Sequence, residues 1–197
     1  MILTMNEQHV LRLLATSINT HLSINEISRA CAITPNGAYK ILIKLETQGI
    51  LKAVRIANIK SYTLDFDHEK TTRVLELAFI PDTLEGRIKS RAVDLQRLRT
   101  VTQACILFGS YITAKKTPND LDVLFILRQK DFETYKRTLS KAQDLVPVKI
   151  QDIIQTTDDL QHNLTKNDPV VTAALRHGIV LWGSAALVEV IKNASQR

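Results

Sequence analysis

The spacing of apolar residues in the first 50 positions predicts three amphipathic helices. Two of them should begin at TMNE (residues 4–7) and SINE (residues 23–26), because Ser or Thr followed three residues later by Glu is the pattern of a capping box. The third should begin at TPNG (residues 34–37), where Thr is a good N-cap and Pro is favoured at the first helical position. This helix is predicted to stop at Gly49.

Two strands should follow, because the runs ILKAVRI (residues 50–56) and IKSYTLDF (residues 59–66) are separated by a plausible tight turn at Ala57-Asn58. This order of elements, a helix, a helix–turn–helix and a hairpin, is that of the winged helix-turn-helix family. The sequence resembles this family along the whole of the segment LSINEISRACAITPNGAYKILIKLETQGIL. In such domains the second helix of the motif enters the DNA major groove. The resemblance and the outward phase of the side chains predict these DNA contacts: Asn36, Tyr39, Lys40, Lys44, Arg55, Asn58 and Lys60.

The charge distribution bears on whether this segment binds DNA. Residues 1–66 contain seven basic and four acidic side chains, and four of the basic ones lie on the proposed recognition helix and wing. The whole chain carries a net charge of +6, which favours a polyanionic partner. A winged helix can also be a dimerisation or protein-binding module, and that alternative stays open. The placement of the charges favours duplex DNA.

Residues 67–103 are predicted to form a helical connector. EKTTRVLELAF has one apolar stripe, Pro81 interrupts it, and TLEGRIKSRAVDLQRLRTVT resumes a helical pattern with five basic and two acidic residues between positions 85 and 99. Such a charge run is usually a solvated helix face, and a face toward nucleic acid or a nucleotide is the alternative. The apolar stripe offers a contact for a homodimer, which we expect because winged domains commonly pair.

From residue 104 the pattern changes to short apolar runs that alternate with amphipathic stretches. ACILF, LDVLFIL and VPVKIQDII have the length and composition of buried strands, KDFETYKRTLSKAQDL is typical of a helix, and NDPVVTAALRHGIVLWG predicts a capped helix followed by a short strand. No apolar stretch approaches the roughly 20 residues that span a membrane. The N-terminus lacks the pattern of a signal peptide, so a cytoplasmic location is expected.

Candidate chemistry is concentrated in ILFGSYITAKKTPNDLDVLFIL, residues 106–127. Gly109-Ser110 follows an apolar strand at a tight turn, and a turn of this kind exposes backbone N–H groups that suit a phosphate. Asp120 and Asp122 are two residues apart on the next strand and therefore project from the same face. Two carboxylates so close repel each other unless a divalent cation lies between them. Mg²⁺ is commonly held by one or two carboxylates together with substrate phosphates.

The arrangement of Gly-Ser, a nine-residue spacer and Asp-x-Asp between two apolar strands resembles the polymerase-β-like nucleotidyltransferases over about residues 103–190. The phrase DPVVTAALRHGIVLWG also resembles the end of small members of that superfamily. The resemblance implies that Gly109 and Ser110 bind a nucleoside triphosphate, ATP or another, and that Asp120 and Asp122 hold Mg²⁺ or Mn²⁺. It also implies a third carboxylate on a later strand, which completes a two-metal catalytic site.

The chain departs from the nucleotidyltransferase pattern in two places. Thr113 and Ala114 stand where many relatives have Arg and Gly, and Lys115 or Lys116 is the candidate replacement. On the later strand, Lys149 stands where small relatives have Asp, and Asp152 lies three residues further on. An odd offset turns Asp152 to the other face of a regular strand, whereas a bulge would bring it back. Asp152 is therefore the candidate third catalytic residue, and a site that binds a nucleotide without transferring it is the alternative.

The predicted architecture is a two-domain protein of α+β or α/β class. It comprises a winged helix-turn-helix domain at residues 1–66, the connector at residues 67–103 and a nucleotidyltransferase-like domain at residues 104–197, with a mixed sheet flanked by helices. The predicted function is Mg²⁺-dependent transfer of a nucleoside monophosphate to a protein, small-molecule or nucleic-acid acceptor by a DNA-binding protein. The alternative is a winged-helix transcriptional regulator whose nucleotidyltransferase-like domain is degenerate and senses a nucleotide or has a structural role.

Overall fold

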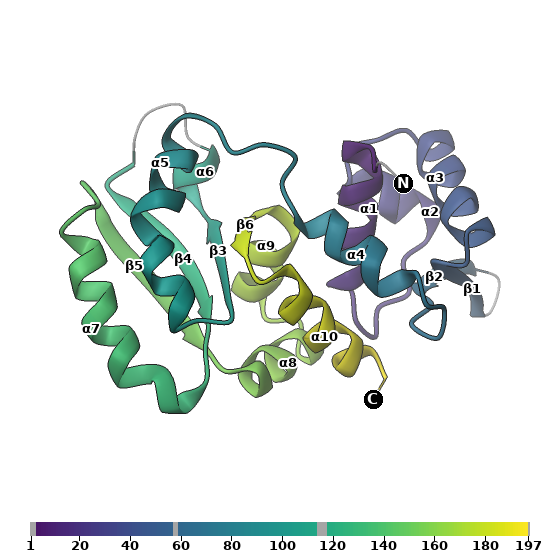
Figure 1. Cartoon of the computed structure of the whole chain (residues 1–197). Helices are drawn as coiled ribbons and strands as arrows, with labels where there is room; N and C mark the ends of the chain where they lie inside the picture. Colours follow the sequence, from purple (N-terminus) through teal and green to yellow (C-terminus); the bar gives the residue numbers. More distant parts are fainter. Residues whose placement is uncertain (1–2, 57–58, 114–117, 197) are drawn as a thin grey trace.

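A computed structural model describes residues 3–56, 59–113 and 118–196. The protein is a mixed α/β structure in which a four-stranded mixed sheet is flanked by helices, and a second, two-stranded sheet lies among the N-terminal helices (Figure 1). In the described part of the chain, no helix has both the length and the apolar character needed to span a membrane.

The N-terminal elements follow the predicted order: α1 (Met5–Ala15), α2 (Ile24–Ala30), α3 (Pro35–Thr47), β1 (Leu51–Ile56) and β2 (Ile59–Leu64). Both predicted capping boxes are present, at the starts of α1 and α2, and Pro is the first residue of α3. The two strands pair antiparallel from Leu51↔Leu64 to Ile56↔Ile59. The predicted turn at positions 57 and 58 lies outside the described residues.

The segment predicted as a connector consists of α4 (Thr71–Phe79), α5 (Gly86–Leu95) and the 3-10 helix η1 (Gln96–Thr100). Its parts lie in different layers of the molecule (Figure 1). Helix α4 packs against α1 and against the C-terminal helix α10 (Ser184–Ser195). Leu95 and Leu98, from α5 and η1, instead pack on one face of the four-stranded sheet. The segment therefore joins two layers rather than forming a layer of its own.

The four-stranded sheet contains β3 (Ala104–Phe108), β4 (Asp120–Ile126), β5 (Lys149–Gln155) and β6 (Ile179–Trp182) in the order β5-β4-β3-β6. β4 and β5 are parallel, whereas β3 is antiparallel to both of its neighbours. The sheet is thus mixed, as predicted, and all four predicted strands are found.

The remaining helices are α6 (Ser110–Thr113), the 3-10 helix η2 (Gln129–Asp131), α7 (Phe132–Gln143), α8 (Thr157–Thr165) and α9 (Pro169–His177). α7 and α9 were expected from the sequence, whereas α8 and α10 were not. Helices α8, α9 and α10 lie between the sheet and the N-terminal elements, and α7 lies on the other side of the sheet (Figure 1).

The two faces of the sheet belong to two apolar cores. Ile106, Leu124 and Ile126 pack with α8, α9 and α10, and this core continues into α1–α4 and the two-stranded sheet. Val123 and Phe125 point to the opposite face, where they pack with α5, η1 and α7. The N-terminal elements and one face of the sheet are consequently built around one continuous apolar core.

Candidate functional site

Six of the residues predicted to contact DNA lie in the described part of the chain, and all six are exposed. Asn36, Tyr39, Lys40 and Lys44 are exposed on α3, and Arg55 and Lys60 are exposed on the two-stranded sheet. Asn58 lies outside the described residues. The structure thus places the predicted contacts on α3 and on the neighbouring hairpin, from which they project into solvent.

The lysines among these residues differ in their partners. Lys44 Nζ lies 2.6 Å from Oε1 of Glu7, a buried residue of α1. Lys60 Nζ lies 3.2 Å from Glu46 Oε2 and 4.8 Å from the centre of the Tyr62 ring. Lys40 has no ion pair in the part of the chain that the structure describes. Lys40 is therefore the cation of α3 whose charge is least compensated within the protein.

The candidate metal-binding pair lies at the start of β4. Asp120 and Asp122 are the first and third residues of this strand, so both carboxylates project from one face, and both side chains are partly exposed. The same face carries Leu124 and Ile126 further along the strand. Asp122 is opposite Phe108 at the end of β3, directly beside the Gly-Ser turn. The structure therefore brings Asp122 together with Gly109 and Ser110.

The turn and the carboxylate fit each other closely. Gly109 has φ +72°, and a Cβ added there would overlap the Asp122 carboxylate. The backbone of Ser110 hydrogen-bonds to the same carboxylate. Glycine is required at position 109 for two reasons, because it adopts a left-handed conformation and because Asp122 occupies the space of a side chain.

The surroundings of Asp122 disfavour its negative charge. Burial raises the pKa of Asp122, the charge of Asp120 raises it further, and the hydrogen bond from Ser110 acts in the opposite direction. A divalent cation between the two carboxylates would offset both the desolvation and the repulsion. The described residues contain no group of three or more His, Cys, Asp or Glu side chains placed to hold a metal ion.

Strand β5 supplies the neighbours of the pair. In the parallel register, Asp120 is opposite Lys149 and Asp122 is opposite Gln151. The Gln151 side chain donates a hydrogen bond from Nε2 to Asp120 Oδ2 at 2.7 Å. The β5 positions on the face of the two aspartates are thus occupied by a cation and a neutral amide.

Asp152, the candidate third catalytic residue, lies on the other face of the sheet. It is opposite Val123, and its Oδ2 accepts a hydrogen bond from the hydroxyl of the buried Tyr135 on α7, at 2.8 Å. Burial raises the pKa of Tyr135, and the hydrogen bond and charge of Asp152 raise it further. The structure therefore does not bring Asp152 to the Asp120–Asp122 pair, and β5 has no bulge in the register there.

Residues 84–173 match the sequence model of a family of unknown function (DUF6932). No curated protein and no solved structure was found to match the chain. The DUF6932 match covers less than half of the chain and extends from just before α5 into α9, so it contains the Gly-Ser turn, the aspartate pair and β5. The N-terminal elements lie outside it.

Within the DUF6932 match, the structure adds a residue that was not predicted for the site. Gln151 hydrogen-bonds to Asp120. The sequence signal for this contact is that Gln151, two residues after Lys149, projects from the same face of β5 as Lys149. The register between β4 and β5, which decides what faces the pair, is not visible in the sequence. Thr113 ends α6, whereas Ala114, Lys115 and Lys116 lie outside the described residues.

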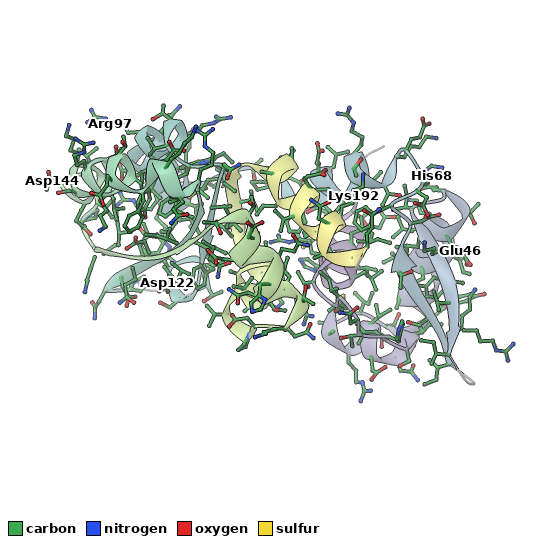
Figure 2. All side chains as sticks on the ribbon, turned by 90° about the horizontal axis from the view of Figure 1, so that it is seen from below. Glu46, His68, Arg97, Asp122, Asp144 and Lys192 are labelled. Carbon is green, nitrogen blue, oxygen red and sulfur yellow. The ribbon has the colours of Figure 1, made fainter. Side chains whose placement is uncertain are left out.

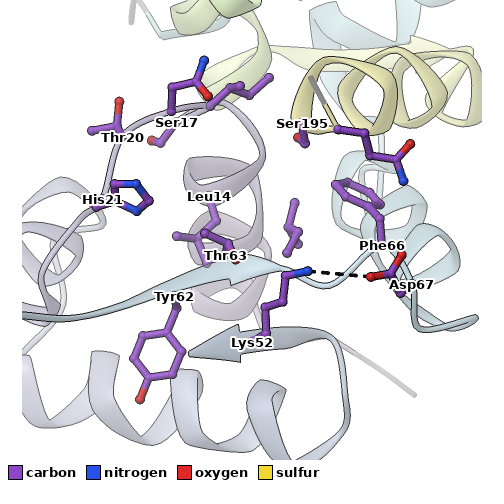
Figure 3. A pocket seen from close by; sticks show the side chains of 14 residues that line it. Leu14, Ser17, Thr20, His21, Lys52, Tyr62, Thr63, Phe66, Asp67 and Ser195 are labelled. Atoms are coloured by element: carbon purple, nitrogen blue, oxygen red, sulfur yellow. Dashed lines mark ion pairs between the residues drawn. The ribbon is translucent and has the colours of Figure 1, made fainter. Parts of the chain in front are cut away.

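A hollow of about 260 Å³ lies away from the aspartate pair, between the two-stranded sheet, the loop after α1 and the end of α10. Lys52 reaches across one side of it and pairs with Asp67 at 3.8 Å (Figure 3). None of the predicted site residues lines this hollow. It is a junction between the hairpin and the C-terminal helix rather than part of either candidate site.

Proposed function

We propose that the protein is a DNA-binding regulator whose C-terminal half, which resembles polymerase-β-like nucleotidyltransferases, binds a Mg²⁺–nucleoside triphosphate complex without transferring the nucleotide. The observation that carries this proposal is the composition of one face of the sheet. Asp120 and Asp122 project there beside Gly109, and the facing positions of β5 hold Lys149 and Gln151. Binding groups are present on this face, and a third carboxylate is not among them.

The proposed binding follows from the chemistry of the pair and the turn. Mg²⁺ prefers oxygen ligands and is usually held by one or two carboxylates plus substrate phosphates and water. Asp120 and Asp122 supply the carboxylates, and the Gly109-Ser110 turn is where the triphosphate would lie. A bound metal ion would also offset the desolvation of the Asp122 carboxylate and its repulsion by Asp120, the two effects that raise the pKa of Asp122.

The absence of transfer follows from the β5 positions. A two-metal displacement requires ligands that fix a second cation beside the attacking hydroxyl. Gln151 is neutral and its amide nitrogen is directed to Asp120, and the Lys149 ammonium would repel a second cation in the same place. A single metal that carries the triphosphate is compatible with this set of side chains, whereas a second metal is not.

Labelled nucleoside triphosphates test this half of the proposal. The wild-type protein should bind one of them in the presence of Mg²⁺, and Asp120→Ala/Asp122→Ala should lose the binding because the metal ligands are gone. Neither protein should release pyrophosphate or label an added protein, small molecule or nucleic acid. Equal binding by the two proteins would show that the aspartates do not form the site.

A second candidate function is Mg²⁺-dependent nucleotidyl transfer to one of these acceptors. It is favoured by the intact Gly-Ser turn and aspartate pair, whose contact between Asp122 and Gly109 is close enough to require glycine. Transfer of label by the wild type, lost in the double variant, would establish this function and overturn the proposal of binding alone.

The DNA-binding half of the proposal is supported by the exposed cations of α3 and the hairpin. Lys40→Ala should weaken duplex binding and reduce the slope of log K against log salt by about 1, as expected for loss of one phosphate contact. Lys141→Ala, which removes an exposed lysine on the distant helix α7, is the matched control. Lys44 is a poorer choice because its removal also leaves Glu7 without its partner. Wild-type binding that does not depend on salt would contradict the assignment.

A further inference from the structure

Two arginines join α1 to α9 in a reciprocal arrangement. The side chain of Arg12, on α1, donates to the carbonyl oxygen of Leu175 from Nε at 2.8 Å and to that of Gly178 from Nη2 at 2.6 Å. These carbonyls lie at the end of α9, where helix carbonyls otherwise lack partners. Its guanidinium also lies over the ring of Phe79, 5.1 Å from the ring centre.

Arg176, in the last turn of α9, makes the converse contact with the end of α1. It donates from Nε to Thr16 Oγ1 at 2.8 Å and from Nη2 to Ser17 Oγ at 3.0 Å. Each helix therefore receives an arginine from the other at its C-terminal end. We call the side chains of Arg12, Arg176, His9 and His177 the α1–α9 seam.

The positive charge of the seam is not balanced by a carboxylate. All the hydrogen-bond acceptors of the two arginines are neutral, and neither arginine has an ion pair in the described part of the chain. Burial lowers the pKa of Arg12 to about 10 and also lowers that of Arg176. The partial negative charge of the helix carbonyls offsets part of the free-energy cost of burying the arginine charges. Buried charges are, however, normally paired with an opposite full charge.

Two histidines of the seam lie beside Arg176. His9 and His177 are both exposed. Although His177 is exposed overall, partial desolvation of its ring lowers its pKa, and the nearby Arg176, Arg12 and His9 lower it further. His177 therefore lies within the electrostatic reach of both arginines. An anion beside them would be stabilised by the charge of Arg176 and could accept hydrogen bonds from the two histidine rings.

A hollow opens at the seam. Its volume is about 200 Å³, and His9, Arg176 and His177 line it together with an apolar floor of Leu13, Ala30, Cys31 and Ala32. A water molecule takes about 30 Å³ in the liquid, so the hollow has room for a larger polyatomic ion. It lies on α1, α2 and α9, whereas the aspartate pair lies on β4.

We propose that the hollow at the α1–α9 seam is a binding site for a small oxyanion of the phosphate class, held by Arg176 with His9 and His177 at the rim. The anion would supply the negative charge that the seam lacks and would stabilise the packing of α1 on α9. The site is independent of the nucleotide site proposed above, because it uses none of the same residues.

Thermal unfolding with increasing inorganic phosphate tests the proposal, with sodium chloride used to hold the ionic strength constant. The melting temperature of the wild type should rise with phosphate concentration, because a ligand that binds only the folded state stabilises it. His9→Ala/His177→Ala and Arg176→Gln should each weaken phosphate affinity about tenfold or more, as expected for the loss of charge-assisted hydrogen bonds. Arg176→Gln removes the charge and keeps a polar side chain, and the melting temperature without phosphate checks the fold of each variant.

Two control variants distinguish phosphate binding at the seam from binding elsewhere on the protein. His162→Ala, an exposed histidine in α8, should keep the full phosphate response, and so should Asp120→Asn/Asp122→Asn. AMP in place of phosphate distinguishes the source of the anion: equal shifts indicate a phosphate monoester, a shift with inorganic phosphate alone indicates the free ion, and either supports the proposal. No shift beyond that of chloride, equal shifts in the seam variants, or loss of the shift in the aspartate variant would overturn it.

Discussion

At the scale of single residues, the candidate nucleotide site depends on the contact between Asp122 and Gly109. The sequence shows a Gly-Ser pair and an Asp-x-Asp pair, and the two-residue period of a strand correctly places both aspartates on one face. The same two-residue period predicts that Asp152 points to the opposite face of the sheet, and in the structure it does, opposite Val123. The close packing of Asp122 on Gly109 could not be predicted, because it depends on how β3 and β4 pair.

The contact predicts a large effect of Gly109→Ala. A left-handed conformation costs a non-glycine residue about 1–2 kcal/mol, and forcing a methyl group against the Asp122 carboxylate adds about 1–3 kcal/mol. Gly86→Ala is the matched control, because Gly86 has φ +51° but no atom near the position of a Cβ. Chemical denaturation should show that Gly109→Ala loses clearly more free energy of unfolding than Gly86→Ala. Equal losses would mean that Asp122 does not pack there.

At the scale of secondary structure, local signals predicted the starts of the first three helices and of α9. Capping boxes and Pro35 marked the beginnings of α1, α2 and α3, because these signals depend on residues three or four positions apart. α8 begins with a capping box of the same kind, Thr156 with Asp159, so the sequence carries a local signal for this unexpected helix as well. α10 has no side-chain cap at its start, so local chemistry marks its beginning weakly.

Contacts between helices were not predictable, and the pair between Glu7 and Lys44 is one example. Glu7 caps α1 and also binds Lys44 of α3, so one buried carboxylate holds two helices. Burial opposes the charge of Glu7, but the hydrogen bonds from Lys44 and Thr4 outweigh it and lower the pKa of Glu7 below its usual value. The pair therefore stabilises the protein when Glu7 is ionised.

Lys44→Ala should lower the free energy of unfolding at pH 7 by about 1–2 kcal/mol, an amount reduced from that of a fully buried pair because Lys44 is half exposed. A carboxyl group with a lowered pKa in the folded state adds stability above its unfolded pKa of about 4.3, and this stability is lost as pH falls through the lower folded value. The difference between wild type and variant should thus shrink in acid. Lys40→Ala, one turn earlier on α3, is the control, and its free energy of unfolding should differ little from that of the wild type at any pH. If the free energy lost in Lys44→Ala stayed the same in acid, the ion pair with Glu7 would be contradicted.

At the scale of the whole molecule, the two candidate sites lie far apart on a common framework. Figure 2 shows Asp122 near one end of the protein and Glu46, on the proposed DNA-reading helix, near the other. The helices between them share one apolar core, which includes Leu11 of α1, Leu75 of α4 and Leu175 of α9. This core and the α1–α9 seam connect the N-terminal elements to the helices that cover the four-stranded sheet. The sequence predicted the N-terminal elements and the nucleotidyltransferase-like half as separate domains, and it did not indicate how far they share this core.

The number of metal ions bound with the nucleotide tests the central claim most directly. Mn²⁺ can replace Mg²⁺ at oxygen-rich sites, and its electron paramagnetic resonance signal distinguishes free from bound ions. Titration of the protein with Mn²⁺ in the presence of a saturating, non-hydrolysable nucleoside triphosphate should show one bound ion per chain in excess of a nucleotide-only control. Asp120→Asn/Asp122→Asn should abolish it. Two ions per chain would contradict the proposal of binding without transfer, and an unchanged signal in the variant would contradict the site itself.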